Sequence, residues 1–451
     1  MVRSRERDAY QKAQMRGISP EVVEQRTIQI LDEILGEASD QVGVRLWNGV
    51  RWPDNRARPA TLVLQHSGAL AQMFSSGTEV GLAEAYLRND FDIEGDIAAA
   101  FEISDIVLGQ LSNWKHKLKM GALLWRAPKA SKTRTAGRLR RNLRGRRHSL
   151  ERDSEAVTFH YDLSKDFYHL WLDRRMVYSC AYFHSPADDL DDAQEQKLDY
   201  LCRKLRLRAG QRVLDIGCGW GAFVLYAAKH FGVHALGITL SEGQAEWARA
   251  RIRETGLDAT ATICACDYRQ VRAEPGYFDA LVSVGMAEHV GREQLPNYFA
   301  IARRLLKPGG VFMNHAIGEG IVPHAANAND SFIERYVFPD GDIPRLSITL
   351  RSAESAGFEI RDIENLREHY ALTLQHWLRR LETQHRDALA FVPEETYRVW
   401  RLYLAAAGHG FRRGHIAVYQ TLLAKLDDRG RAILPLTRAD WYRDRQHHAP
   451  V

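Results

Sequence analysis

Three glycines at alternate positions end an apolar run, at a point where a chain that leaves a strand must turn sharply. Gly217, Gly219 and Gly221 lie within VLDIGCGWGAF, residues 213–223, and Asp215 stands just before them. Glycines let the backbone turn tightly and approach a ligand, and a helix that opens after them presents free N–H groups. The pattern predicts a nucleotide-like cofactor, which can be NAD, FAD or S-adenosylmethionine. The G-x-G-x-G spacing differs from the dinucleotide fingerprint and favours S-adenosylmethionine.

A second apolar strand is expected at residues 233–238, and it ends in Thr239 rather than in an acidic residue. Ribose hydroxyls still need hydrogen-bond partners, and Thr239 and Gln244 can supply them. The structural alternative is that Ser241 and Gln244 form an S-x-x-Q capping box for the next helix. The two roles are compatible, so both stay open.

Two more strands are expected at residues 260–266 and 278–285. The first ends in Asp267 and Tyr268, which place an acceptor for an adenine amino group and an aromatic face at the carboxyl edge of the sheet. The second strand delivers MAEH, residues 286–289, to the same edge, where open parallel sheets place their chemistry.

Nine segments follow one another in a recognisable order. They are HYDLSKDFYHLWLD, YSCAYF, the glycine loop, GITLSEGQ, SVGMAEHVG, KPGG, NHAIG, RYVFPDGDIP and EHYALTLQHW. With them the chain resembles the S-adenosylmethionine-dependent cyclopropane-fatty-acyl-phospholipid synthases and the related mycolic acid cyclopropane synthases. The resemblance implies an α/β, Rossmann-like class I methyltransferase with a mixed seven-stranded sheet and a helical cap, plus a small amino-terminal α+β domain.

The resemblance also implies a reaction at a carbon double bond, which is a poor nucleophile with no proton to remove first. Attack on the sulfonium methyl leaves a carbocation, so the site must stabilise positive charge and hold a base. In the resembled family that base is a bound bicarbonate. Its cage matches Cys180, Glu288, His315, Ile317 and Tyr370 of this chain, with His289 beside Glu288.

Each cage position has a role that its chemistry permits. His315 and Tyr370 can donate hydrogen bonds to the anion, and Cys180 with the backbone at Ile317 can complete the cage. Glu288 can accept the proton that bicarbonate carries while it orients His315, and a protonated His315 would raise the affinity for the anion. Taken alone, a Glu-His pair is as compatible with a surface ion pair.

Two further expectations come from the resemblance. Tyr178 and Ser179 would lie over the methionine part of the cofactor. Many family members carry a cysteine near YLAAAGHGF, where this chain has Ala407. This departure weakens a covalent cysteine mechanism, because the remaining candidate, Cys180, sits in the anion cage.

Length and composition fit a large two-domain enzyme of 451 residues. We expect a lipid-binding or dimerisation-type domain at 1–125, a basic linker at 126–152 and the catalytic domain at 153–451. No apolar run approaches 18 residues and no secretory signal opens the chain, which predicts a cytoplasmic protein at the inner face of the membrane. Five cysteines fit neither a disulfide scaffold nor a metal site.

The net charge is only +5, but basic residues crowd the linker. Such a run suits an anionic membrane surface, and a solvated linker is an equal alternative, with nucleic acid a distant third. The resemblance of the segment at 81–102 to longer, phospholipid-acting family members implies lipid docking and a homodimer.

The carboxyl-terminal third is expected to form a helical cap around one strand at 357–366. The segment FRRGHIAVYQTLLAKL, residues 411–426, is expected to be its last long helix. Such a cap would exclude water, which otherwise converts the carbocation to an alcohol. Five aromatic residues are candidates for lining an acyl tunnel, with core packing as the alternative: Phe332, Tyr336, Phe338, Trp377 and Tyr403.

The predicted function is therefore transfer of a methylene group from S-adenosylmethionine to unsaturated phospholipid acyl chains. A methyl- or methylene-branching enzyme is the first alternative, because the same carbocation can lose a different proton. A methyltransferase for RNA or an amine is disfavoured, since MAEH stands where an N-P-P-aromatic motif would be expected. A non-catalytic lipid-binding protein is disfavoured by the glycine loop.

Overall fold

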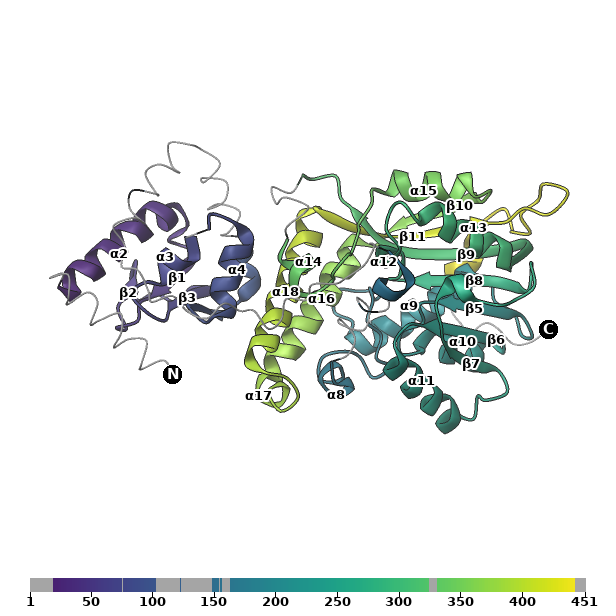
Figure 1. Cartoon of the computed structure of the whole chain (residues 1–451), viewed down its shortest axis with the longest axis horizontal. Helices are drawn as coiled ribbons and strands as arrows, with labels where there is room; N and C mark the ends of the chain where they lie inside the picture. Colours follow the sequence, from purple (N-terminus) through teal and green to yellow (C-terminus); the bar gives the residue numbers. More distant parts are fainter. Residues whose placement is uncertain are drawn as a thin grey trace. The chain divides into compact units, whose positions relative to one another are not determined.

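The chain forms two compact units in a computed structural model (Figure 1). The described residues are 19–74, 76–102, 122, 148–153, 155, 163–323 and 331–442. The first unit is drawn from residues 1–142, 325–337 and 393–409, and the second from 143–324, 338–392 and 410–451. Most of the predicted basic linker, at 126–147, lies outside the described residues.

The first unit combines a small sheet with short helices. Its elements are α2 (Pro20–Leu35), β1 (Val42–Arg45), β2 (Arg51–Trp52), β3 (Ala60–Leu64), α3 (Ala69–Phe74), α4 (Glu79–Leu87), β4 (Phe91–Gly95) and α14 (Phe332–Tyr336), with most of α18 (Glu394–Arg413). The strands pair in the order β2-β1-β3-β4. Arg398, from the late α18 segment, is buried here and donates to the Tyr86 carbonyl at 3.0 Å and to Asp92 at 2.7 Å. The late segment therefore completes the core of this unit.

The second unit is built on a seven-stranded sheet with the order β10-β11-β9-β8-β5-β6-β7. The strands are β5 (Arg212–Ile216), β6 (His234–Thr239), β7 (Ala261–Ala265), β8 (Phe278–Val284), β9 (Leu306–Glu319), β10 (Glu359–Asn365) and β11 (Ile416–Ala424). All neighbours among β9, β8, β5, β6 and β7 are parallel, whereas β11 is antiparallel to both β9 and β10. The mixed seven-stranded sheet and its first four strands are confirmed.

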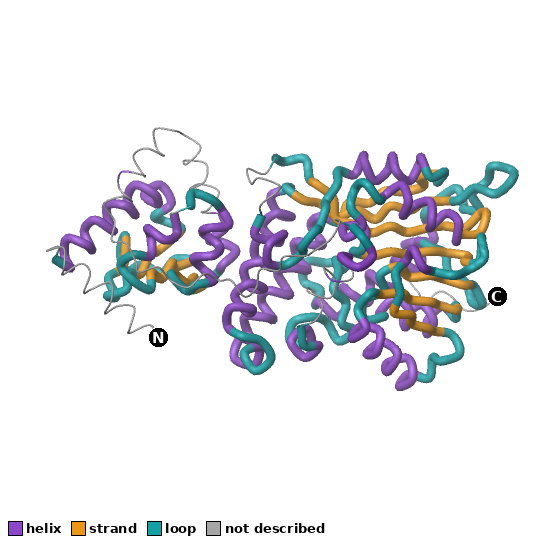
Figure 2. The backbone as a smooth tube through the Cα atoms, in the orientation of Figure 1, coloured by secondary structure: helices purple, strands orange, loops and turns teal. Residues whose placement is uncertain are grey.

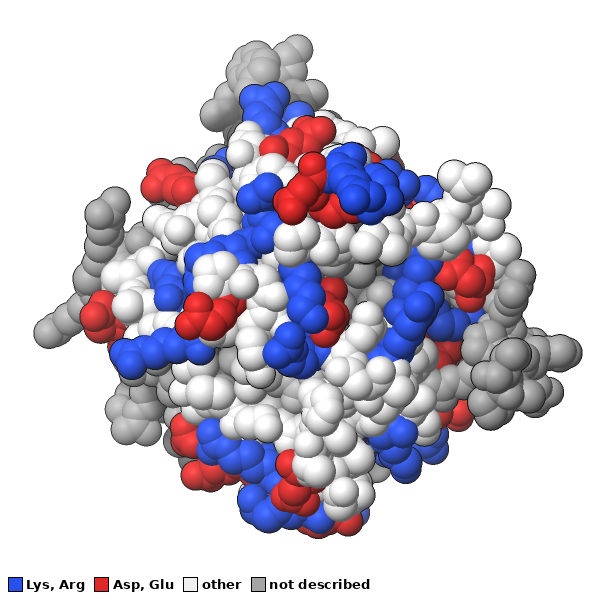
Figure 3. All heavy atoms as spheres, turned by 90° about the vertical axis from the view of Figure 1, so that its right-hand side faces the viewer, with Lys and Arg blue, Asp and Glu red and all other residues white. Residues whose placement is uncertain are grey.

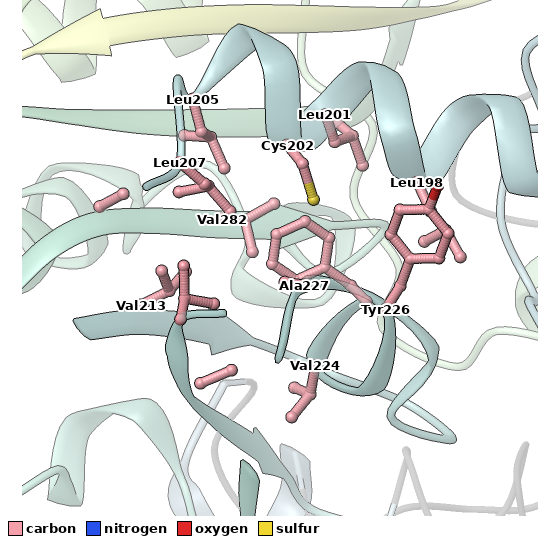
Figure 4. Packing of buried hydrophobic residues seen from close by; sticks show 14 of the residues in the cluster. Leu198, Leu201, Cys202, Leu205, Leu207, Val213, Val224, Tyr226, Ala227 and Val282 are labelled. Atoms are coloured by element: carbon pink, nitrogen blue, oxygen red, sulfur yellow. The ribbon is translucent and has the colours of Figure 1, made fainter. Parts of the chain in front are cut away.

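Helices cover both faces of this sheet (Figures 1 and 2). They are α8 (Lys165–His169), α9 (Leu190–Lys204), α10 (Ala222–Phe231), α11 (Glu242–Thr255), α12 (Ala287–Val290), α13 (Leu295–Leu305), α15 (Leu346–Ser355), α16 (Arg367–Thr383) and α17 (His385–Ala388). Val213 packs in one core with α9 and α10, while its neighbour Leu214 packs in another with α13. Figure 4 shows the first core, where Leu201 and Cys202 of α9 lie over Ala227 of α10. Successive strand residues thus anchor opposite helix layers.

The predicted last helix at 411–426 is wrong in its main part. Helix α18 ends at Arg413, and Ile416–Ala424 forms β11 between β9 and β10. The strand is buried on both faces, because Leu422 belongs to one core and Leu423 to the other. An apolar run without alternation cannot be assigned by periodicity, and its Ile, Val, Tyr and Thr content was the signal for a strand.

Candidate active site

The loop after β5 has a backbone that only glycine adopts without strain. Gly217 has φ +83° and Gly221 has φ +81°. A Cβ on Gly217 would lie 2.7 Å from Cγ of Met286, and a Cβ on Gly221 would lie 2.9 Å from Cβ of Ala248. Helix α10 then begins at Ala222. The glycines therefore let the loop pass close to its neighbours and direct a helix N-terminus at the sheet edge.

A pocket lies at the carboxyl ends of β5, β6, β7 and β8. The residues predicted for the cofactor that line it are Tyr178, Ser179, Asp215, Gly217, Gly219, Thr239, Gln244, Asp267 and Tyr268. Gly221 is not in the lining, since it packs against α11. The pocket gathers backbone from the loop, hydroxyls from β6 and an aromatic ring from β7, which is the inventory that an adenosyl group needs.

The segment after β6 serves the helix and the pocket together. The Ser241 hydroxyl accepts a hydrogen bond from the Gln244 N–H at 3.3 Å, so Ser241 caps α11. The Gln244 side chain does not close the capping box. Its Oε1 accepts from the Thr239 hydroxyl at 2.9 Å. Thr239 and Gln244 thus form a polar pair that lines the pocket.

Asp267 and Tyr268 reach the pocket with a partner that the sequence did not reveal. Arg269 donates from Nε to Oδ1 of Asp267 at 2.7 Å and from Nη2 to Oδ2 at 2.7 Å. Oδ1 also accepts from the Arg269 backbone N–H at 2.8 Å, so Oδ2 is the oxygen that keeps a second lone pair for an adenine amino group. Arg269 also binds Asp153 at 2.8 Å, and both residues line the pocket.

Ser179 is held by two buried side chains of α9. Lys197 Nζ donates to the Ser179 hydroxyl at 2.9 Å, and Gln194 Nε2 donates to its carbonyl at 2.9 Å. Lys197 is 2% exposed and lines the pocket. Burial lowers the pKa of Lys197 to about 8, and burial raises the pKa of nearby Asp215 to about 7.

Sequence reasoning missed Lys197, although the sequence contains a signal for it. Positions 190, 194, 197, 201 and 204 follow the 4-3-4-3 spacing of one helix face. Leu190 and Leu201 keep that face apolar, whereas Lys197 and Lys204 interrupt it, and both lysines are buried. Charged residues on a buried stripe need specific partners.

The five residues predicted for the anion cage meet around β9, and we call them the β9 cluster. Glu288 Oε1 accepts from the Ile317 backbone N–H at 2.6 Å. Ile317 pairs across the sheet with Val418 of β11, whose carbonyl accepts from Leu366 N at 2.9 Å. The Leu366 carbonyl in turn accepts from the Tyr370 N–H at 3.0 Å.

Cys180 is linked to the β9 cluster through the carbonyl of Leu366. Its thiol donates to the Leu366 oxygen at 3.8 Å and to the Ala181 oxygen at 3.2 Å. Burial raises the pKa of the Cys180 thiol far above its usual range. A thiol held in its neutral form is a poor nucleophile, and Ala407 offers no replacement. Covalent catalysis by Cys180 is therefore disfavoured.

Two atoms of the β9 cluster are buried without a hydrogen-bond partner, Glu288 Oε2 and His315 Nε2. Burial raises the pKa of Glu288 to about 7, although the Ile317 N–H acts against this. A carboxyl group with this pKa can take up or release a proton near neutral pH. Unpartnered polar atoms in a buried position point to a ligand, because leaving them unsatisfied costs free energy.

His315 differs from its expectation in two respects. Its Nδ1 lies 3.3 Å from Gln420 Nε2, so the described contact that orients the ring comes from Gln420, whereas Glu288 bonds Ile317. Burial, with the positive charges of Lys197 and Lys204, holds the pKa of His315 well below its usual range. This shift favours a neutral imidazole over the protonated His315 that was considered from the sequence.

Aromatic rings connect the cofactor pocket with the β9 cluster. Tyr178, in the pocket lining, has its ring centroid 5.2 Å from that of Trp377, which lies 6.0 Å from the ring of Tyr370. Aromatic faces attract cations such as a sulfonium group. Of the proposed tunnel residues, Trp377 and Phe338 belong to the second unit, and the other three belong to the first.

No group of three or more His, Cys, Asp or Glu side chains arranged to hold a metal ion occurs among the described residues. None of the five cysteines forms a disulfide, and Cys180, Cys202 and Cys218 are buried.

The fold and the pocket define the class of protein. A mixed seven-stranded sheet whose first strand ends in a glycine loop, with polar groups after the next two strands, is that of an S-adenosylmethionine-dependent methyltransferase. Residues 148–421 match the family model of mycolic acid cyclopropane synthetase. The chain belongs to this family, and the resemblance seen in the sequence is confirmed.

Relatives support this assignment. A probable fatty acid methyltransferase of Pseudomonas putida is 39% identical over 403 residues, which cover 89% of this chain and 96% of the relative. The cyclopropane-fatty-acyl-phospholipid synthase of Escherichia coli K12 is 38% identical over 59% of this chain and 66% of its own length. The structure of the cyclopropane synthase MmaA2 of Mycobacterium tuberculosis matches with a TM-score of 0.58 and 34% identity, over 60% of this chain and 98% of that one.

Proposed function

We propose that the protein transfers a methylene group from S-adenosylmethionine to the cis double bond of unsaturated acyl chains in membrane phospholipids and so forms cyclopropane fatty acids. The observation that carries the proposal is the pair of buried, unpartnered atoms, Glu288 Oε2 and His315 Nε2, in a cluster that aromatic rings connect with the cofactor pocket. An amine or a hydroxyl group also needs a base, but an alkene loses its proton only after methyl transfer, so the base has to lie next to the carbocation.

The reaction requires a positioned cofactor, stabilisation of a carbocation and a base, and the second unit has residues suited to each of these requirements. The alkene attacks the sulfonium methyl, so the pocket must hold the cofactor in line with the double bond. The resulting carbocation requires electron-rich surroundings, which Tyr178, Trp377 and Tyr370 provide. Ring closure then needs a base for one proton of the new methyl group.

The β9 cluster offers groups that suit a small anion such as bicarbonate. His315 Nε2 and Glu288 Oε2 are the buried atoms that such a ligand would satisfy. When bound, bicarbonate supplies the base for the proton lost on ring closure. Glu288, with a pKa of about 7, is suited to take that proton onward.

Relatives support a lipid substrate. The Escherichia coli relative is named for a fatty-acyl-phospholipid substrate, and the structure of the mycolic acid cyclopropane synthase CmaA1, 33% identical with a TM-score of 0.56, was determined with SAH and CTAB. No helix among the described residues is long and apolar enough to cross a membrane. We propose that the protein reaches its lipid substrate at the inner face of the membrane.

The segment that docks on lipid is proposed to be the basic run at 126–152 or the first unit, which can also pair subunits. On the face of the second unit that Figure 3 shows, basic and acidic side chains are interspersed, and no broad field of one sign covers it. Neutralising Arg140, Arg141, Arg146 and Arg147 tests the basic run. Unchanged sedimentation with anionic vesicles would exclude it.

A branching reaction is the second candidate. The Pseudomonas putida relative, which matches 89% of this chain, is named a probable fatty acid methyltransferase, and a tuberculostearic acid methyltransferase of Mycobacterium tuberculosis is 38% identical over 292 residues. Both outcomes start from the same carbocation and differ in the proton that is lost.

One assay separates the candidates. The purified protein is incubated with S-adenosylmethionine, bicarbonate and vesicles of monounsaturated phospholipid, and the released fatty acids are analysed by mass spectrometry and proton NMR. A product one CH₂ heavier with upfield ring protons supports cyclopropanation. The same mass with vinylidene protons identifies a branching enzyme, and an unaltered acyl pool with bound cofactor contradicts both.

A further inference from the structure

A buried chain of hydrogen bonds leads to His315 from the side opposite its unpartnered Nε2. It begins at Lys204, the last residue of α9, whose side chain is 0% exposed. Lys204 Nζ binds the carboxylate of Glu364 on β10 and donates to Gln420 Oε1 on β11 at 2.9 Å. Gln420, which is also 0% exposed, places its Nε2 at 3.3 Å from His315 Nδ1.

The ammonium group of Lys204 decides which way the Gln420 amide faces. An ammonium group has three donors and no acceptor, so it requires the amide oxygen. The carboxylate of Glu364 and, at 3.7 Å, that of Asp362 keep Lys204 paired in its charged form. The amide nitrogen of Gln420 therefore has to face the imidazole.

An amide nitrogen donates and cannot accept, so His315 Nδ1 has to present its lone pair. We propose that Lys204 and Gln420 are positioning residues that lock His315 in the neutral tautomer with its proton on Nε2. The proposal rests on the anion cage of the proposed function, because the locked N–H is the donor that an anion would meet there. Neither Lys204 nor Gln420 lies in any of the nine sequence segments that carry the family resemblance.

The lock also explains why the site does without an imidazolium. A second proton would have to sit on Nδ1, where it would face the N–H groups of Gln420 without an acceptor. Lys197 and Lys204 add positive charge, while the acidic groups Glu364 and Asp362 are paired with Lys204. The anion thus meets a fixed neutral donor.

The tautomer can be read directly by nitrogen-15 NMR of protein labelled at histidine, with the His315 signal assigned by its loss in His315→Gln. The wild-type protein should show a protonated Nε2 and an unprotonated Nδ1 across neutral pH. In Gln420→Glu the carboxylate can accept from both neighbours, so the proton should appear on Nδ1. A wild-type protein with the proton on Nδ1, or an unchanged tautomer in Gln420→Glu, overturns the proposal.

Kinetics supply the second readout. Lys204→Met should lower kcat about 10- to 100-fold, as loss of an outer hydrogen-bonding partner does elsewhere, while the dissociation constant for S-adenosylhomocysteine stays the same. Lys425→Met is the control, because Lys425 directly follows β11 and donates to the backbone carbonyls of Arg303 and Leu306, at 2.9 and 2.7 Å, outside the chain of hydrogen bonds to His315. An equal loss of kcat in both variants overturns the positioning role.

The two experiments separate this proposal from the proposed function. The NMR measurement needs neither lipid nor turnover, so the predicted tautomer can be established in a protein that makes no cyclopropane product. Conversely, cyclopropane formation with a proton on Nδ1 of His315 supports the function and overturns the lock.

Discussion

The cofactor pocket and the β9 cluster occupy the same edge of one sheet, but they are assembled in different ways. The pocket is centred on a contiguous loop whose glycines supply the shape through the backbone, from Gly217 to Gly221. The β9 cluster is made of side chains from separate segments, and some of them depend on partners more than 100 positions away, as His315 depends on Gln420 and Cys180 on Leu366. A local motif therefore determines where the cofactor binds, and long-range strand pairing determines how the side chains of the β9 cluster are arranged.

The difference separates binding from chemistry. A change in the glycine loop should alter the affinity for the cofactor, whereas a change in the β9 cluster should alter turnover with the cofactor still bound. A single substitution that lowers both the affinity for the cofactor and kcat would show that the pocket and the β9 cluster depend on each other.

The largest effect is expected for Glu288→Gln. The amide keeps the size of the side chain but cannot take a proton, so kcat should fall about 1000-fold, within the range for general bases. Binding of S-adenosylhomocysteine, measured by calorimetry, should be unchanged. A comparable loss of affinity would contradict the separation.

Gly217→Ala tests the other region. Its φ of +83° and the 2.7 Å approach to Met286 force the loop to shift, so affinity for S-adenosylhomocysteine should fall about 100-fold. Gly210→Ala is the control, because Gly210 has φ +79° with nothing within 4 Å of the added Cβ. An equal loss of affinity in both variants would mean that backbone strain, and not the close approach to Met286, weakens cofactor binding.

Lys197→Met tests the part of the cofactor pocket that lies outside the glycine loop, because Lys197 reaches the pocket from α9. A buried ammonium that bonds Ser179 is suited to the carboxylate of the methionine moiety, so affinity for S-adenosylhomocysteine should fall about 10-fold. Methylthioadenosine lacks that carboxylate and should bind equally to both proteins. The exposed Lys229→Met serves as control, and an equal loss for both ligands would argue against the carboxylate contact.

The smallest effect is expected in the pH profile. Glu288 must be ionised to accept a proton, and its pKa is about 7, so kcat/KM of the wild-type protein should rise as pH increases through about 7. The residual activity of Glu288→Gln should lack this rise. His315 should add no step near neutral pH, because burial lowers its pKa. Bicarbonate has to be held at one concentration throughout, and an identical rise in Glu288→Gln would assign the titration to another group.

Sequence alone predicted the parts of the molecule whose signals are local. The strands before Gly217, Thr239, Asp267 and Met286 were placed correctly, and so was the helix cap at Ser241. Local signals failed where both faces of an element are buried, as in β11, because alternation of polar and apolar residues then disappears.

The partners of His315 could not be predicted for a related reason. Gln420 lies opposite His315 only in the observed register of β11 against β9, and a shift by one residue would turn its side chain to the other face. Lys204 was visible as a charge on an apolar stripe, but its partners come from β10 and β11. The pattern indicates that Lys204 needs buried partners, but it does not indicate which residues they are.

The position of β11 imposes an order on biosynthesis. The ribosome completes β5 to β8 well before β11, and at about 5–20 residues per second the intervening chain takes on the order of ten seconds. During that interval the nascent chain already contains the glycine loop but does not yet contain Gln420. Because β11 must enter between β9 and β10, the sheet is completed and His315 gains its Gln420 partner only when this last strand has been made.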